Sequence, residues 1–155
     1  MKPVATLDDI LAAEAQGWPE DLPDSTYDLI RRGAAIDPDA PALSFFLKAE
    51  SLREAEVWTY RELLGRITQT ANAFHALGVG KDDVVSFLLP NLPETHFTIW
   101  GGQASGIVAA FNPLLEPAAM ATLLAAVRTK VLVTLAPFPG TDLWPRLQPV
   151  LETVD

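Results

Sequence analysis

The chain has no cysteine and only two histidines among its 155 residues. Without thiols it can form neither disulfide bonds nor thiolate metal sites, and this composition fits a reducing compartment. Two histidines are too few for a histidine-rich metal cluster. The sequence therefore predicts no metal centre built on these two residue types.

Cations are also scarce, with 11 lysines and arginines against 20 aspartates and glutamates, for a net charge of −9. Phosphate binding requires a basic face, so nucleic acid is a poor partner. The acid is unevenly placed, because residues 1–39 hold nine of the carboxylates and only three of the basic residues. A solvated acidic face is the expected meaning of this segment.

A long apolar run is the third absence. No stretch reaches the roughly 20 apolar residues of a membrane span, because charged residues such as Glu116 and Lys130 interrupt the apolar second half. The first residues, Met1, Lys2 and Pro3, lead into an acidic segment rather than the apolar core of a signal peptide. We therefore expect a soluble cytoplasmic protein without a membrane span.

Apolar sequence itself is plentiful, at 49% of the chain, which is enough for one compact core at this length. The first half predicts helices at residues 6–15 and 25–36, then a β-hairpin of strands 42–48 and 55–58 around a polar turn at 49–54. Thr59 and Glu62 form a capping box that begins the next helix, and Gly78 supplies its left-handed end.

From Gly78 onward strands and helices alternate. The pattern predicts strands at residues 84–89, 107–111 and 130–135. It predicts helices at 93–105, 116–128 and 141–154, the last broken or bent near Pro145 and Pro149. Short links between alternating strands and helices indicate an α/β fold with a parallel, doubly wound sheet.

Two glycine-containing segments invite comparison with phosphate-binding loops. Gly101 and Gly106 have the four-residue gap of such a loop, but no lysine with serine or threonine follows, and these glycines end a helix. Residues 78–81 follow a helix and precede a strand, so their backbone amides face the wrong way for a phosphate. We interpret the first segment as close helix packing and the second as a helix end with a turn.

His75 and His96 are candidate general bases by residue type. His75 borders the apolar stripe of its helix, and His96 lies near Trp100 on the following one. Neither has a nucleophile or an orienting carboxylate close to it in the sequence. We therefore interpret both as histidines at the boundary of the core.

Residues 89–94 and 111–113 directly follow strands, at the edge where open α/β sheets bind ligands. The first segment is the better positional candidate for a pocket rim. The alternative interpretation is a rigid strand-to-helix turn, in which Asn91 or the backbone beside it caps the helix and Glu94 occupies the first turn. We favour the turn, and the same two interpretations apply to Asn112 and Pro113.

Five segments occur in an order that resembles the start of the AMP-forming acyl-CoA synthetases, in the adenylate-forming superfamily. They are residues 58–63 (Trp-Thr-Tyr-Arg-Glu-Leu), 77–84, 89–94 (Leu-Pro-Asn-Leu-Pro-Glu), 106–113 and 130–134. The resemblance covers residues 27–134. The Asn112 and Pro113 pair favours the acyl-CoA synthetase branch over peptide-synthetase adenylation domains.

The resemblance implies a short β-hairpin and helices followed by parallel βαβαβ units, the first part of a large N-terminal domain. Residues 1–40 would be an acidic helical arm, and residues 41–155 a truncated first α/β subdomain. The parent protein would be an acid–CoA ligase. It would activate a carboxylic acid, for which we expect a fatty acid, with ATP and Mg²⁺ to an acyl-adenylate, and then transfer the acyl group to coenzyme A.

The resemblance also implies that these 155 residues are an N-terminal fragment without activity of its own. The family's phosphate loop ending in lysine, its adenine-site motif, its ribose-binding aspartate and its C-terminal catalytic lysine are missing from the sequence. Met120 and Ala121 also stand where the family usually has glutamate and leucine. We therefore assign no catalytic, cofactor-binding or metal residue, and expect no ATP, Mg²⁺ or coenzyme A on the fragment.

A second class of function stays open, in which the chain is a self-contained, non-enzymatic binding or assembly module with the same fold segment. The sequence that follows Asp155 would distinguish the two. A fragment would leave apolar surface uncovered, and we expect it in the second half, at Trp100, Phe111, Leu132, Phe138 and Trp144. Such a surface predicts self-association.

Overall fold

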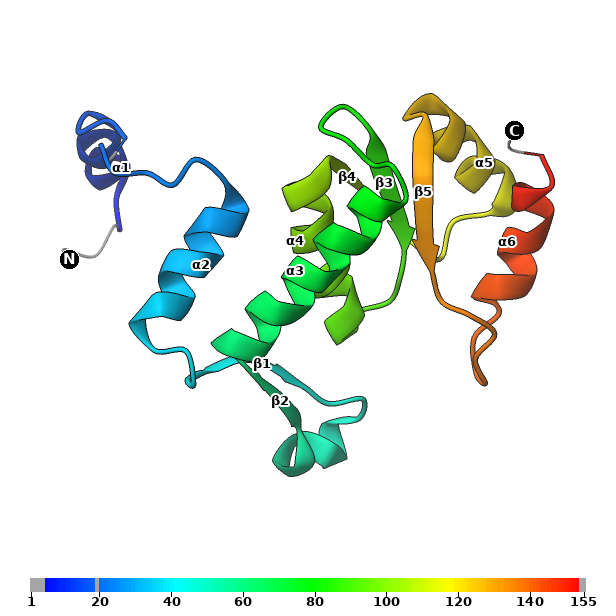
Figure 1. The fold of residues 1–155 in the computed structure, drawn as a ribbon, viewed down its shortest axis with the longest axis horizontal. Coiled ribbons are helices and arrows are strands. Elements are labelled where there is room, and N and C mark those ends of the chain that lie inside the picture. Colours follow the sequence, from blue (N-terminus) through cyan, green and yellow to red (C-terminus); the bar gives the residue numbers. More distant parts are fainter. Residues whose placement is uncertain (1–4, 19, 154–155) are drawn as a thin grey trace.

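A computed structural model describes residues 5–18 and 20–153. Helices and strands follow one another in nearly the predicted order (Figure 1). They are α1 Leu7–Glu14, α2 Thr26–Ile36, β1 Pro41–Phe45, the 3-10 helix η1 Ala49–Glu54, β2 Glu56–Thr59, α3 Tyr60–Ala76, β3 Val84–Leu88, α4 Pro93–Ser105, β4 Ile107–Ala110, α5 Pro117–Ala126, β5 Thr129–Thr134 and α6 Leu143–Leu151.

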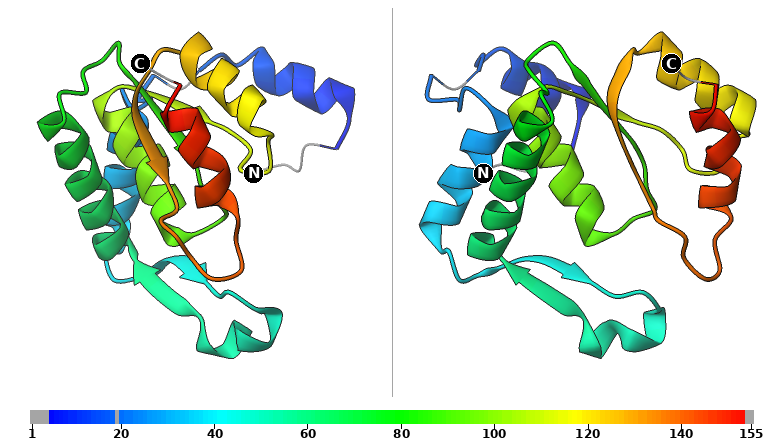
Figure 2. Two further views of the ribbon diagram at one scale, coloured as in Figure 1. Left: turned by 90° about the vertical axis from the view of Figure 1, so that its right-hand side faces the viewer. Right: turned by 45° about the vertical axis from the view of Figure 1, so that its right-hand side comes forward.

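The main sheet is parallel and has the strand order β4-β3-β5. Val85 of β3 is paired with Val108 of β4 on one side and with Val131 of β5 on the other. Helices α3 and α4 cover one face of this sheet, and α5 and α6 cover the other (Figures 1 and 2). The predicted doubly wound α/β arrangement is therefore confirmed.

Each face of the sheet has its own core. On one side Phe74, Val79 and Val85 are buried together. On the other side Leu88 of β3 packs with buried residues of the last two helices, which are Met120, Leu124, Leu143, Leu147 and Val150. Successive residues of β3 serve opposite faces because side chains alternate along a strand. Buried Ser86 is satisfied by a 2.7 Å hydrogen bond with the Thr129 hydroxyl.

The β-hairpin is antiparallel, with Leu43 opposite Trp58 and Phe45 opposite Glu56. The predicted polar turn is the 3-10 helix η1, and the first strand ends at Phe45, not at residue 48. Trp58 holds the hairpin against the helices. Its ring meets Phe97 edge to face at 5.1 Å between centroids, and Arg66 lies 5.3 Å from its centroid.

The two N-terminal helices begin at side-chain caps. Thr6 and Asp9 form a capping box for α1, and Ser25 caps α2 by accepting from Asp28 N–H. Helix α2 lies beside α3, where the Tyr27 hydroxyl is 2.8 Å from the Thr68 hydroxyl. Helix α1 has no buried residue and stands away from the rest of the chain (Figures 1 and 2).

Two expectations about the second half need correction. Helix α6 continues through Pro149 to Leu151 in one piece, so of the predicted break or bend the break is wrong, and residue 154, its predicted end, lies outside the described residues. Of the five aromatic and aliphatic residues expected to be uncovered, only Phe138 is strongly exposed, at 57%. Because α5 and α6 cover that face of the sheet, most exposed large apolar side chains lie before residue 60 instead.

Within the described ranges, no helix is both long enough and apolar enough to cross a membrane.

Candidate functional site

The best-placed surface for a ligand is the edge of the sheet where the parallel strands end. From β3 the chain passes through α4 to β4 on one side, and from β4 it crosses through α5 to β5 on the other. Chain connections that leave a central strand in opposite directions open a crevice at the carboxyl ends of the strands. Loops 89–92 and 135–142 flank this crevice.

An apolar pocket of about 310 Å³ occupies this edge. Its lining comes from three parts of the chain: the hairpin, the loop after β3 and the loop after β5. The lining residues are Leu47, Pro90, Asn91, Leu92, Leu135, Phe138, Pro139, Gly140 and Thr141. A neighbouring pocket of about 540 Å³ shares Leu47, Leu92, Leu135 and Phe138 with it. We refer to the two together as the carboxyl-edge pocket.

Thr95 shapes the turn on the rim of the carboxyl-edge pocket. Its hydroxyl donates to the Pro90 carbonyl at 2.6 Å and accepts from Leu92 N–H at 3.3 Å. Leu92 is the residue that precedes α4, so of the two predicted caps the structure has the backbone beside Asn91 and not the Asn91 side chain. Glu94 lies in the first turn of α4, as predicted. Residues 89–94 are thus both a rigid turn and a pocket wall.

Asn112 plays a local role after β4. Its side-chain oxygen accepts from Leu114 N–H at 2.9 Å, which closes the turn before α5. It does not line the carboxyl-edge pocket. The turn interpretation therefore applies to Asn112, and the pocket interpretation does not.

The chemistry of the carboxyl-edge pocket suits binding of an apolar group. Its lining includes two carboxylates, Glu56 and Glu94, and no lysine or arginine. Phosphate groups need cations or converging backbone amides, so this lining is a poor match for a triphosphate. Among the described residues no group of three or more histidines, cysteines or carboxylates is arranged to hold a metal. The residues present therefore do not fit ATP with its Mg²⁺.

Both glycine-containing segments have the structural roles predicted for them. A Cβ on Gly101 would lie 2.7 Å from Thr70 Cβ, and one on Gly102 would lie 2.5 Å from Val108 Cγ2. These glycines let α4 approach α3 and the sheet. Gly78 has φ of +81° and ends α3, where Val79 N–H bonds to the Phe74 carbonyl at 3.0 Å.

The two histidines are not brought together. His75 is exposed in the last turn of α3, and His96 is partly buried near the start of α4. Neither lines the carboxyl-edge pocket. The structure thus brings neither of them to the candidate site.

At the opposite edge of the sheet, Lys130 ties three segments together. Its ammonium donates to Asp83 Oδ2 at 2.7 Å and to the Gly78 carbonyl at 2.6 Å, and Gly80 N–H donates to the same carboxylate at 2.8 Å. The Lys130 hydrogen bond, followed by that of Gly80, holds the pKa of Asp83 below its usual value. The partners are 47 residues apart, so no local sequence pattern indicates this contact.

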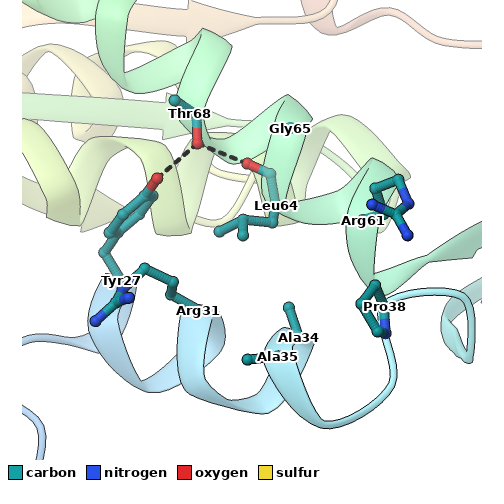
Figure 3. A pocket seen from close by; sticks show the side chains of 9 residues that line it. All are labelled: Tyr27, Arg31, Ala34, Ala35, Pro38, Arg61, Leu64, Gly65 and Thr68. Atoms are coloured by element: carbon teal, nitrogen blue, oxygen red, sulfur yellow. Dashed lines mark hydrogen bonds between the residues drawn. The ribbon is translucent and has the colours of Figure 1, made fainter.

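A second cleft, of about 510 Å³, lies between α2 and α3. Figure 3 shows Ala34 and Leu64 pointing toward one another from the two helices. Arg31 lies beside Tyr27 at one end of this α2–α3 cleft, and Arg61 lies beside Pro38 at the other. Sequence reasoning placed no site here, because the cleft exists only once the two helices are side by side.

Comparison with known proteins decides the family. The family model described as AMP-binding enzyme matches residues 30–154, which is most of the chain. The chain belongs to the AMP-binding enzyme family. The resemblance inferred from residues 27–134 is thereby confirmed. The relatives that match are CoA ligases, which is the class of enzyme that the resemblance implies.

Two relatives illustrate the match. It is 36% identical over 105 residues to the marinolic acid–CoA ligase of Pseudoalteromonas sp., covering 68% of the chain and 16% of that protein. It is 37% identical over 106 residues to the crotonobetaine/carnitine–CoA ligase of Salmonella arizonae, covering 68% of the chain and 20% of that protein. The chain therefore spans a fifth or less of these relatives' length.

The fold agrees with solved structures of such enzymes. The anthranilate CoA ligase AuaEII, solved with anthranoyl-AMP, superposes with a TM-score of 0.71 over 86% of this chain and 24% of that one, at 21% identity. At that identity the likeness concerns the fold. The parallel sheet and its flanking helices thus share the fold of part of that enzyme.

Proposed function

We propose that this chain is the first part of an acid–CoA ligase. The ligase activates a carboxylic acid with ATP and Mg²⁺ to an acyl-adenylate, and then forms the thioester with coenzyme A. The observation that carries the proposal is the family match over residues 30–154, together with relatives whose printed names are CoA ligases. In this proposal residues 1–40 are an arm, residues 41–155 are the first α/β subdomain, and the enzyme acts in the cytoplasm.

We propose an apolar acid, with a fatty acid as the first choice. The carboxyl-edge pocket supports this, because Leu47, Leu92, Leu135 and Phe138 supply an apolar wall shared by its two parts. Cavities of several hundred cubic ångströms lined in this way favour hydrophobic groups over charged ones. The acyl chain would lie along this wall, with its carboxylate held by residues outside these 155.

We propose further that the 155 residues alone have no ligase activity. Adenylation builds negative charge on phosphoryl oxygens, and its stabilisation requires cations or donors aimed at them. The carboxyl-edge pocket offers Glu56 and Glu94 instead. The residues that hold ATP, Mg²⁺ and coenzyme A would therefore belong to a longer polypeptide.

The test is acid-dependent exchange of pyrophosphate into ATP. We expect no exchange above background with the 155-residue chain and any of a series of acids from acetate to palmitate. We expect exchange with the polypeptide encoded by the longest reading frame that contains these residues, and a preference there for the longer acids. Exchange by the 155 residues alone would refute their inactivity. No exchange by the longest product would favour the non-enzymatic module.

A further inference from the structure

Helix α1 carries an apolar stripe that no described part of its own chain covers. Leu7, Ile10 and Leu11 follow one another at helical spacing on one side and are 68%, 44% and 53% exposed. An acidic residue lies toward each end of the stripe, Asp8 in the first turn and Glu14 at the last position. A helix this short gains stability in water mainly by packing its apolar side against another surface.

The α2–α3 cleft has the complementary features. Ala34, which is 5% exposed, and Leu64 form its apolar floor. Arg31 and Arg61 stand at its two ends (Figure 3), with 61% and 64% of their side chains exposed. They pair with Asp28 and Asp39, but a guanidinium has five N–H donors and can donate to a second carboxylate as well.

We propose that α1 of one copy docks in the α2–α3 cleft of a second copy, and that the exchange is reciprocal. Leu7, Ile10 and Leu11 would cover Ala34 and Leu64, and the acidic residues at the two ends of α1 would face the two arginines. The product is a two-fold symmetric dimer in which each arm fills the other copy's cleft.

The link between α1 and α2 favours a second copy over the same chain. The Asp21 carbonyl accepts from Arg32 Nη1 at 2.7 Å, which anchors the link to α2. Pro23, in the same link, restricts the backbone of the residue before it to extended conformations. Helix α1 contributes no residue to the lining of its own α2–α3 cleft, and Figure 1 shows it on the far side of α2 from α3.

Reciprocity strengthens a small contact. Once one arm has docked, the second docks within the same complex, at a high effective concentration. The interface consists of two eight-residue helices and their clefts, so it lies at the small end of specific interfaces. We therefore expect a reversible dimer with a dissociation constant in the micromolar range or weaker.

The experiment is sedimentation velocity of the 155-residue chain from low micromolar to near-millimolar concentration. The parent should shift from monomer to dimer as concentration rises. Leu11→Asp places a charge in the stripe of α1. Gly65→Gln places a side chain in the cleft, at a position where an added Cβ meets nothing within 4 Å. Each variant changes both contacts of a symmetric dimer and should weaken it by at least about tenfold.

Two comparisons separate docking from general effects. Leu29→Asp puts the same charge at a 58% exposed leucine of α2 that does not line the cleft, and it should leave the dimer unchanged. Glutamine is a better helix former than glycine, so Gly65→Gln should not lower the melting temperature. An equimolar mixture of Leu11→Asp and Gly65→Gln retains one intact arm and one intact cleft. It should associate at concentrations where each variant alone is monomeric.

Three outcomes would overturn the proposal. The first is a parent that is monomeric at every concentration, whether or not hydrogen exchange shows α1 protected in its own cleft. The second is a dimer that survives both Leu11→Asp and Gly65→Gln, which would place the contact elsewhere, for example at the open edge of β4. The third is a Leu29→Asp dimer weakened as much as that of Leu11→Asp, which would show that the added charge, and not the stripe of α1, weakens association.

Discussion

Gly101 and Gly102 show how single residues set the spacing of this fold. Each lies where α4 is in contact with a neighbour, Gly101 against Thr70 of α3 and Gly102 against Val108 of β4. Glycine is otherwise unfavourable inside a helix, by about 1 kcal/mol relative to alanine. Its presence at both positions therefore reflects the closeness of the packing rather than helix preference.

Gly102→Ala should destabilise the chain by about 1–3 kcal/mol, because the new methyl group would lie 2.5 Å from Val108 Cγ2 and force α4 from the sheet. The matched control is Gly65→Ala in α3, where an added Cβ meets nothing within 4 Å. That variant should gain up to about 1 kcal/mol from helix propensity. Urea unfolding of the two variants and the parent would measure these changes in the free energy of unfolding. Equal effects would contradict the packing role of Gly102.

Asp83 should make the folded state sensitive to acid. Its folded pKa is held below the ordinary value of 3.8 by Lys130 and by Gly80 N–H. A carboxyl group with a lowered folded pKa stabilises the fold fully above its unfolded pKa, and this stability is lost as pH falls through the folded pKa. The contribution of Asp83 is therefore constant near neutral pH and disappears below about pH 4.

The measurement compares the parent with Asp83→Asn in urea unfolding between neutral pH and about pH 3. The parent should be the more stable at neutral pH. The difference in the free energy of unfolding between the parent and Asp83→Asn should narrow only in the most acid samples. Asp82→Asn changes the exposed carboxylate next to Asp83 and is the control. Its free energy of unfolding should match that of the parent at each pH. A gap that persists undiminished in acid would show that the Lys130 contact does not depend on the charge of Asp83.

At the scale of elements, two capping boxes that both begin with threonine should have different consequences. Thr59 begins α3, which contributes buried Ile67 and Phe74 to the body of the protein. Thr59→Ala should therefore cost about 1 kcal/mol of global stability. Thr6 begins α1, which has no buried residue, so Thr6→Ala should leave the global unfolding curve unchanged. A Thr6→Ala effect as large as that of Thr59→Ala would mean that α1 unfolds together with the body.

Elements were predictable where the signal is local. Both capping boxes, the left-handed Gly78 and the apolar strand 84–88 are written in adjacent residues, and the structure has them within one or two positions. The strand order β4-β3-β5 depends on which edge of β3 each later strand joins, and no residue pattern specifies that. Of the break or bend predicted for α6, the break does not occur, because the packing of Leu147 and Val150 outweighs the hydrogen bond that Pro149 cannot make.

The candidate site was predictable in part for the same reason. Residues 90–92 follow a buried strand directly, so their place at the carboxyl edge could be inferred. Leu47 and Phe138 reach the same pocket from the hairpin and from the loop after β5, more than forty residues away on either side. Thr95 was missed because its role depends on two backbone groups that come within reach only when the turn has formed.

At the scale of the whole molecule, stability is divided between the two faces of one sheet. Leu147 is fully buried in the core that joins α5 and α6 to Leu88 of β3. Arg146 adds a polar tie, since it donates to the carbonyls of Leu114 and Leu115 in the turn before α5. The last helix is therefore an integral part of the body and not an appended tail.

Leu147→Ala should consequently cost about 2–5 kcal/mol and lower the unfolding midpoint seen by every probe of the body. The same substitution at Leu151, one turn further along α6 and 45% exposed, is the control and should change stability by about 0.5 kcal/mol or less. Chemical unfolding followed by both fluorescence and far-ultraviolet circular dichroism would measure the two. A drop confined to one probe would indicate that α6 unfolds separately.

The central place of β3 also has a consequence during synthesis. One side of β3 pairs with β4, which leaves the ribosome soon after β3. The other side stays unpaired until β5 has also been synthesised. Thr134, the last partner of β3, follows Leu88 by 46 residues. At ordinary elongation rates that delay is about 2–9 seconds. Throughout it the nascent chain presents an unpaired apolar strand edge, which is the kind of segment that aggregates unless a chaperone shields it.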